Sequence, residues 1–199
     1  MFARLEIVHG GTGQPDRMAA LGVVAHRPGF AGGYLLEQLG VGRATLLTLW
    51  KNDVTAGKPS AGNPGDSYHV HDDWSGRAAT ERPTAASVLY FDGPLSPARI
   101  AAGRRANRER LQPALRDQPG MVRVLSLWQP EERKVIVVAL ATSLATLEAA
   151  SNTVNSTELL DGEDPALLTG PDRVDVHRVV DHATAHAHTE PQSIEETVS

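Results

Sequence analysis

The chain of 199 residues contains no cysteine. This absence excludes disulfide bonds, thiolate catalysis, cysteine-ligated zinc and iron–sulfur clusters. Aromatic residues are also scarce, at 5% of the chain, with three each of tryptophan, tyrosine and phenylalanine. A binding surface built from large rings would therefore use most of those that the chain has.

The chain also lacks a basic surface signal and long apolar runs. Its net charge is −5 and its pI about 5.9, whereas a nucleic-acid binder shows a basic stripe. No apolar run approaches the roughly 18 residues that cross a bilayer. The N-terminal letters MFARLEIV show no basic segment followed by an apolar stretch, so no signal peptide is predicted. We expect a cytoplasmic protein that binds neither nucleic acid nor membrane.

Two similar segments indicate two similar halves. The Pro-Gly pair at 28–29 stands 91 positions before the pair at 119–120 (119 − 28), and this offset lays RATLLTL (43–49) on KVIVVAL (134–140). Both copies consist of a Pro-Gly turn, an extended segment, a polar break and a longer apolar strand. A duplicated unit of this size indicates two small domains that bury a face against each other.

The order of predicted elements is the same in both halves. Strands are expected at 3–8, 33–39, 43–50 and 67–74, and again at 86–93, 121–128, 134–141 and 173–180. Helices follow the first strand of each half, and the second-half helix carries Pro113, which predicts a kink. Each half thus follows the β-α-β-β-α-β, ferredoxin-like order. The predicted fold is α+β, with tandem ferredoxin-like units packed sheet to sheet as an intrachain α/β barrel.

Composition places the unit boundaries in polar segments. We assign residues 1–80 to a first ferredoxin-like unit and residues 85–181 to a second one. Residues 53–66, rich in Gly, Pro and Ser, are expected to form a loop. Residues 182–199 are polar and acidic with several histidines, which predicts a disordered tail.

These features resemble the dimeric α/β-barrel superfamily, and within it the antibiotic-biosynthesis-monooxygenase (ABM) type of domain, here as two fused copies. The segments that carry the resemblance are HRPGF (26–30), TLLTLW (45–50) and QPGMVRVLSLW (118–128). The resemblance implies one of several functions, namely cofactor-independent oxygenation of aromatic polyketides, haem degradation, or no known reaction. Haem-degrading members use an Asn on the first strand, a Trp on the third and a His beyond it. Trp50 fits the tryptophan and His69 or His71 the histidine, but the first strand carries no asparagine.

The proposed pocket gathers aromatic, amide and imidazole groups of the first half. We assign catalytic roles to Trp50, Asn52 and His71, because a nearby amide or imidazole can stabilise the deprotonated form of a substrate that reacts with O₂. The residues expected to bind the substrate are Trp50, His69, Tyr34, Trp74, Trp128 and Arg123. For the tryptophans, packing in the core is the competing interpretation.

Metal binding is a weaker hypothesis. His69 and His71 stand at i and i+2 of a predicted strand, with Asp73 next in line, so all three would share one face and Tyr68 and Trp74 the other. Zn²⁺ or Fe²⁺ would accept such ligands, but no further ligand has a sequence signature. His177 lies at the corresponding place in the second half, and we expect it to be equivalent to His71.

The function predicted from the sequence is an ABM-like monooxygenase that acts on a hydrophobic small molecule, aromatic molecules included, without an organic cofactor. The alternatives are a non-catalytic small-molecule or haem-binding protein of the same superfamily, or a metal-binding protein that uses His69 and His71. No cofactor is expected under the first hypothesis, whereas haem or a divalent metal belongs to the alternatives. Assembly into a homodimer is left open.

Overall fold

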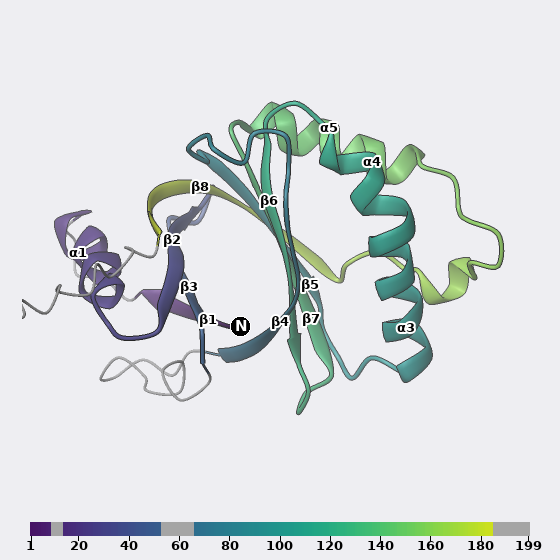
Figure 1. The fold of residues 1–199 in the computed structure, drawn as a ribbon, viewed down its shortest axis with the longest axis horizontal. Coiled ribbons are helices and arrows are strands. Elements are labelled where there is room, and N and C mark those ends of the chain that lie inside the picture. Colours follow the sequence, from purple (N-terminus) through teal and green to yellow (C-terminus); the bar gives the residue numbers. More distant parts are fainter. Residues whose placement is uncertain (9–13, 53–65, 185–199) are drawn as a thin grey trace, which may run out of the picture.

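The computed structural model describes residues 1–8, 14–52 and 66–184. Eight strands and a small set of helices make up this part of the chain (Figure 1). The strands are β1 (Phe2–Val8), β2 (Phe30–Gln38), β3 (Ala44–Trp50), β4 (Asp66–Ser75), β5 (Ala85–Phe91), β6 (Met121–Gln129), β7 (Lys134–Ala141) and β8 (Arg173–Thr184). The helices are α1 (Gln14–Ala25), α3 (Pro97–Ala106), the π-helical segment η1 (Asn107–Leu111), α4 (Gln112–Arg116), α5 (Leu144–Ser156) and the short 3₁₀ turn η2 (Pro165–Leu167).

The eight strands form one closed ring in the order β1-β3-β2-β8-β5-β7-β6-β4. Every neighbouring pair is antiparallel, including the pairs β2–β8 and β4–β6 that join the two halves of the chain. Within each half the strands follow an equivalent order, β4-β1-β3-β2 and β8-β5-β7-β6. The predicted α+β class is therefore confirmed, and the ring leaves none of these strands with an unpaired edge.

The interior of the ring is a continuous apolar core. All eight strands contribute buried side chains to it, among them Leu36, Leu47, Leu127 and Val138, each of them fully buried. Residues that alternate with these along each strand point outward, toward the helices. The sheet therefore has two faces with different neighbours, namely the barrel interior and the helix side.

Two separate apolar layers lie on the helix side. In the first half, α1 packs over β2 and β3 through Leu21 and Val24, whose neighbours are Phe30, Leu46 and Trp50. We call this the first helix layer. In this layer α1 lies close to β2, because a Cβ atom added to Gly33 would lie 2.8 Å from Leu21 Cδ1.

In the second half, α4 and α5 cover the outward faces of β5, β6 and β7 (Figure 1). We call this the second helix layer. Its buried members are Trp74, Ala85, Leu115, Met121, Val124, Ala139, Ala141, Leu147 and Ala150. None of the helices in the described residues is both long enough and apolar enough to cross a membrane.

Two predicted details can be compared with the structure. Pro113 was expected to kink its helix, and the helix widens into a π turn just before it, in which the Gln112 N–H donates to the Asn107 carbonyl. Proline has no N–H and its ring crowds the carbonyl four residues earlier, so a wider turn just before it relieves both problems. The last strand, β8, continues to Thr184 and thus includes residues 182–184 of the expected tail. The rest of that tail and the expected loop at 53–65 lie outside the described residues.

Candidate functional site

A row of rings crosses five neighbouring strands on the helix side of the sheet. Its members are Trp128, His69, Phe2, Trp50 and Phe30, and each pairs with the next across a strand boundary. The Phe2 and His69 rings lie 4.8 Å apart, and the Phe30 and Trp50 rings meet edge to face at 5.8 Å. Directly opposed residues of antiparallel strands project from the same face. We call this set the aromatic row.

The row changes from buried to exposed along its length. Trp50 is only 3% exposed, and its Nε1 donates a hydrogen bond of 2.9 Å to the Thr48 hydroxyl. Trp128 is half-buried and His69 is exposed. The structure thus brings three of the predicted site residues, Trp50, His69 and Trp128, onto one face. Among the described members of the row, His69 is the exposed one, Trp128 and Phe2 are half-buried, and Trp50 and Phe30 are buried.

A buried ion pair lies beside the aromatic row. Arg4 and Glu6 alternate with the inward-facing Ala3 and Leu5 along β1, so both project to the helix side. Arg4 Nε lies 2.5 Å from Glu6 Oε1 with side-chain exposures of 5% and 10%. The contact is one of opposite charges and not an aligned hydrogen bond. Arg4 is paired directly with Thr48 on β3, next to Trp50.

Arg4 and Glu6 were not predicted as site residues, although the sequence carries a signal for them. In the strand ARLEIV the two charged residues are two positions apart. In a β-strand this spacing places both side chains on the same face. Charged residues are almost never buried without a partner, and such pairs concentrate at sites that perform chemistry or bind charge. A carboxylate and a guanidinium between apolar rings could move a proton and stabilise an anion.

The prediction that Asp73 shares a face with His69 and His71 is wrong, whereas both histidines lie on the helix side. A β-bulge between Val70 and Asp72 adds one residue to β4 and reverses the alternation beyond it. As a result Tyr68 belongs to the barrel interior and Trp74 to the second helix layer, whereas the prediction placed them on one common face.

His71 is displaced toward the helices of the second half. Its Nδ1 lies 3.5 Å from the Arg104 guanidinium on α3. Partial desolvation, followed by the positive charge of Arg104, lowers the pKa of His71. His71 is therefore neutral near pH 7. It lies beside Arg104 and not in the environment of Trp50, where the prediction had placed it.

Tyr34, Arg123 and Asp73 meet inside the barrel and not at the aromatic row. Arg123 on β6 forms a two-point ion pair with Asp73 at 2.8 and 2.7 Å and donates to the Tyr34 hydroxyl at 3.2 Å. The hydrogen bonds that Arg123 donates to the Asp73 carboxylate raise the pKa of Arg123. This network ties β2 of the first half to β4 and β6 through the barrel interior. It is saturated by its own members, so a substrate-binding role for Tyr34 and Arg123 gains no support here.

The remaining predicted site residues lie apart from one another. Asn52 is exposed two residues beyond Trp50, at the end of β3. Trp74 is 6% exposed in the second helix layer, packed among aliphatic side chains, and its indole N–H has no partner in the described residues. Trp74 is a core residue there, which was the competing interpretation.

His177 is not the counterpart of His71. It lies on β8, is 2% exposed, and faces the barrel interior together with Asp175. Desolvation lowers the pKa of His177. In the part of the chain that the structure describes, no group of three histidine or carboxylate residues could hold a metal ion. Asp73 is also engaged at both oxygens by Arg123.

No protein-family model and no curated protein matches the chain. Solved structures do match its fold. A candidate monooxygenase from Fusobacterium nucleatum is 6% identical, with 92% of this chain and 93% of that chain covered and a TM-score of 0.64. An anthrone oxidase-like protein is 14% identical, with the same two coverages and a TM-score of 0.54. A heme-degrading enzyme from Listeria monocytogenes is 11% identical, with 90% and 99% covered and a TM-score of 0.52. At these identities the similarity establishes the fold alone.

Proposed function

We propose that the protein is an ABM-like monooxygenase that oxidises a hydrophobic aromatic small molecule without an organic cofactor, at the aromatic row. The observation that carries this proposal is the buried Arg4–Glu6 ion pair beside Trp50 and Thr48. An ion pair buried in an apolar layer is weak evidence for stability, because desolvation offsets most of its attraction. A chemical role gives a reason for its presence.

The proposed reaction needs only a base, a stabilised anion and O₂. Glu6 removes a proton from a methylene carbon between aromatic rings, and Arg4 stabilises the negative charge that spreads to the substrate oxygen. The resulting carbanion reacts with O₂. The carbon loses two hydrogens and gains one oxygen atom, and the second oxygen atom leaves with both hydrogens as water. The balance is R₂CH₂ + O₂ → R₂C=O + H₂O, which requires no external reductant.

The substrate class follows from the same chemistry. A methylene group is acidic enough for a carboxylate base only when its anion is delocalised over flanking rings and a carbonyl, as in anthrone. One structural neighbour is described as anthrone oxidase-like, which supports the choice of anthrone as the first substrate to test. Haem degradation is not proposed, since β1 carries Arg4 and Glu6 on this face and no asparagine.

We also propose that the halves are two fused copies of an ABM-type unit, residues 1–80 and 85–181. Support comes from the equivalent strand orders and from the Pro-Gly turns that precede β2 and β6. Gly29 and Gly120 both adopt a positive φ, of 83° and 82°, at corresponding places. The reaction is assigned to the first unit.

The test is oxygen uptake with anthrone, against a blank without protein that measures spontaneous oxidation. The double variant Arg4→Met/Glu6→Leu replaces the ion pair by apolar groups of similar size, an exchange that buried pairs tolerate well. We expect the wild-type protein to consume one O₂ per anthraquinone formed, and the double variant to lose about 10²-fold or more of the rate. A wild-type rate equal to the blank, or an unimpaired double variant, refutes the proposal. A Soret band on titration with haem would instead favour the haem-binding alternative.

A further inference from the structure

Arg104 differs from the next three arginines along the helix. Arg105, Arg108 and Arg110 each form an ion pair with a glutamate. In the described residues Arg104 has no carboxylate partner, and the side chain that it contacts is His71. A histidine side chain is neutral or cationic, so His71 cannot balance the guanidinium charge, and its lowered pKa favours the neutral form.

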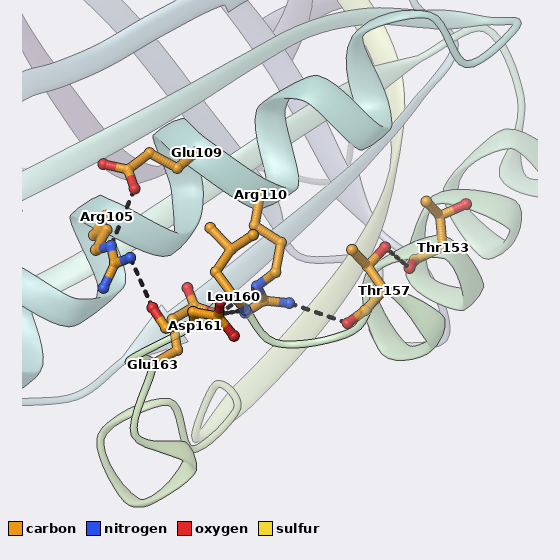
Figure 2. Close-up of polar contacts among 8 residues, drawn as sticks. All are labelled: Arg105, Glu109, Arg110, Thr153, Thr157, Leu160, Asp161 and Glu163. Carbon is orange, nitrogen blue, oxygen red and sulfur yellow. Dashed lines mark hydrogen bonds and ion pairs between the residues drawn. The ribbon is translucent and has the colours of Figure 1, made fainter.

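The other arginines hold the helix in place from its opposite side. Figure 2 shows Arg105 donating to the Asp161 carbonyl at 3.0 Å, and Arg110 paired with Glu163 at 2.9 Å. Both members of the Arg110–Glu163 pair are nine-tenths buried or more. Consecutive helix residues project about 100° apart. The helix is tied through Arg105 to the loop that contains Asp161 and Glu163, so Arg104 projects from another side of the helix. That side faces β4, where His71 lies.

The bulge in β4 completes the arrangement. It brings the His71 ring to Arg104 and turns Asp72 toward the helix, where the Asn107 side-chain amide donates to the Asp72 carboxylate at 3.2 Å. The Asp72 carboxylate thus accepts a hydrogen bond from an amide, and among the described residues no ion pair joins it to Arg104. Arg104 and His71 are both exposed, so a dissolved anion can reach them.

The aromatic row passes close to this cation. His69 lies two residues before His71 on β4, a step of roughly 6–7 Å along a strand. His69 is the exposed member of the row, and the half-buried Trp128 is its direct cross-strand partner. The open aromatic surface of Trp128 and His69 is therefore separated from the Arg104 guanidinium by about the length of an aromatic ring system. No carboxylate among the described residues pairs with this guanidinium.

We propose that the open end of the aromatic row binds a planar aromatic acid. Its rings pack on Trp128 and His69, and its ionised oxygen, a carboxylate or a phenolate, accepts hydrogen bonds from Arg104. Guanidinium groups suit this role because their planar set of donors matches a carboxylate and their charge is permanent. The proposal rests on the location of the proposed function and narrows its substrates to those that carry an acidic group.

The experiment is isothermal titration calorimetry with two probes of equal ring size, 2-naphthoate and the neutral 2-naphthalenemethanol. Arg104→Gln removes the cation, and Arg108→Gln is the matched control, because Arg108 lies one turn further along the same helix and is 71% exposed. We expect Arg104→Gln to weaken naphthoate binding by about 10- to 100-fold and Arg108→Gln to leave it unchanged. Trp128→Leu should weaken the binding of both probes.

Several outcomes would overturn the site. These are a wild-type protein that does not bind naphthoate, equal binding of the acid and the alcohol, and equal losses in the two arginine variants. Thermal melting of each variant checks the fold, which these exposed substitutions should preserve. The proposed reaction can fail separately. A protein that binds naphthoate through Arg104 but leaves anthrone unchanged refutes the reaction and not the binding site.

Discussion

The two halves place different residues at equivalent positions of the same sheet. The pairing of β1 with β3 and of β5 with β7 has the same register, so each position in the first half has a counterpart in the second. On the helix side Phe2, Arg4, Glu6, Thr48 and Trp50 correspond to Ala85, Ser87, Leu89, Ala139 and Ala141. The first half carries rings, charges and a hydroxyl where the second carries small or aliphatic groups.

This difference separates stability from chemistry. Ala139 and Ala141 are buried and leave room for α4 and α5 to pack on the sheet with Leu115 and Leu147. In the first half the large side chains themselves fill the layer, and one ion pair is desolvated among them. The second helix layer is an ordinary apolar core. The first includes polar groups that a core does not need.

Replacing Trp50 by alanine, the residue at the equivalent position of the second half, should have the largest effect on stability. Trp50→Ala removes a side chain that is 3% exposed and leaves a cavity, so we expect a loss of about 3–5 kcal/mol in the free energy of unfolding. Urea denaturation measures it. Trp128→Ala is the control, since its half-buried ring should cost clearly less. Equal losses would mean that the two ends of the aromatic row are packed alike.

Placing a larger side chain at Ala141, the equivalent position of the second half, should reduce the free energy of unfolding by a smaller amount. Ala141→Leu adds volume at a fully buried position under the helices, and overpacking of this kind costs about 1–3 kcal/mol. Naphthoate binding should be unaffected, because Ala141 belongs to the second helix layer. If the substitution is neutral in urea denaturation, that layer is looser than the burial of its residues indicates.

A single hydrogen bond gives a finer comparison. Thr48→Val removes the acceptor of the Trp50 indole N–H, and we expect a loss of about 1 kcal/mol. Thr48→Ser keeps the hydroxyl and should retain most of the stability. Trp74 in the second half shows that this barrel tolerates an indole N–H without a partner in the described residues. If Thr48→Val leaves the free energy of unfolding unchanged, the hydrogen bond from the Trp50 indole N–H contributes nothing measurable to stability.

The barrel interior, shared by both halves, should respond to acid. The folded pKa of His177 is below its unfolded value near 6.5, so the unfolded chain takes up a proton first as the pH falls. Stability therefore decreases below about pH 6.5 until the folded protein is protonated as well. Asp175 and Arg173 are the charged groups beside His177 and oppose each other. In urea denaturation at pH 7 and pH 5, His177→Gln should lose less stability than the wild type. Equal losses would assign the effect to other groups.

Local patterns in the sequence predicted the elements but not the faces. The Pro-Gly turns and the apolar run 134–140 indicated turns and strands that the structure contains. The face of each β4 side chain could not be predicted, because a one-residue bulge reverses the alternation and has no clear sequence signal. For that reason Asp73 was assigned to the face of the two histidines.

The aromatic row could not be assembled from sequence alone. Its five members come from β6, β4, β1, β3 and β2, and their alignment depends on the registers of four strand pairs, one of which joins the two halves. No role for Arg104 was predicted from the sequence. Its separation from its neighbours follows from the loop that anchors Arg105 and Arg110, which lies about 50 residues away in the sequence. Long-range pairing of this kind leaves no local periodicity.

Closure of the ring within one chain has a consequence for how this protein can change. In a barrel built from two identical subunits, every substitution appears twice, once in each helix layer. Here the strand pairs β2–β8 and β4–β6 close the ring between different stretches of one polypeptide. A substitution at Arg4 therefore leaves Ser87 untouched. Each layer can accumulate its own mutations, so selection for activity and selection for stability can act on separate sets of codons.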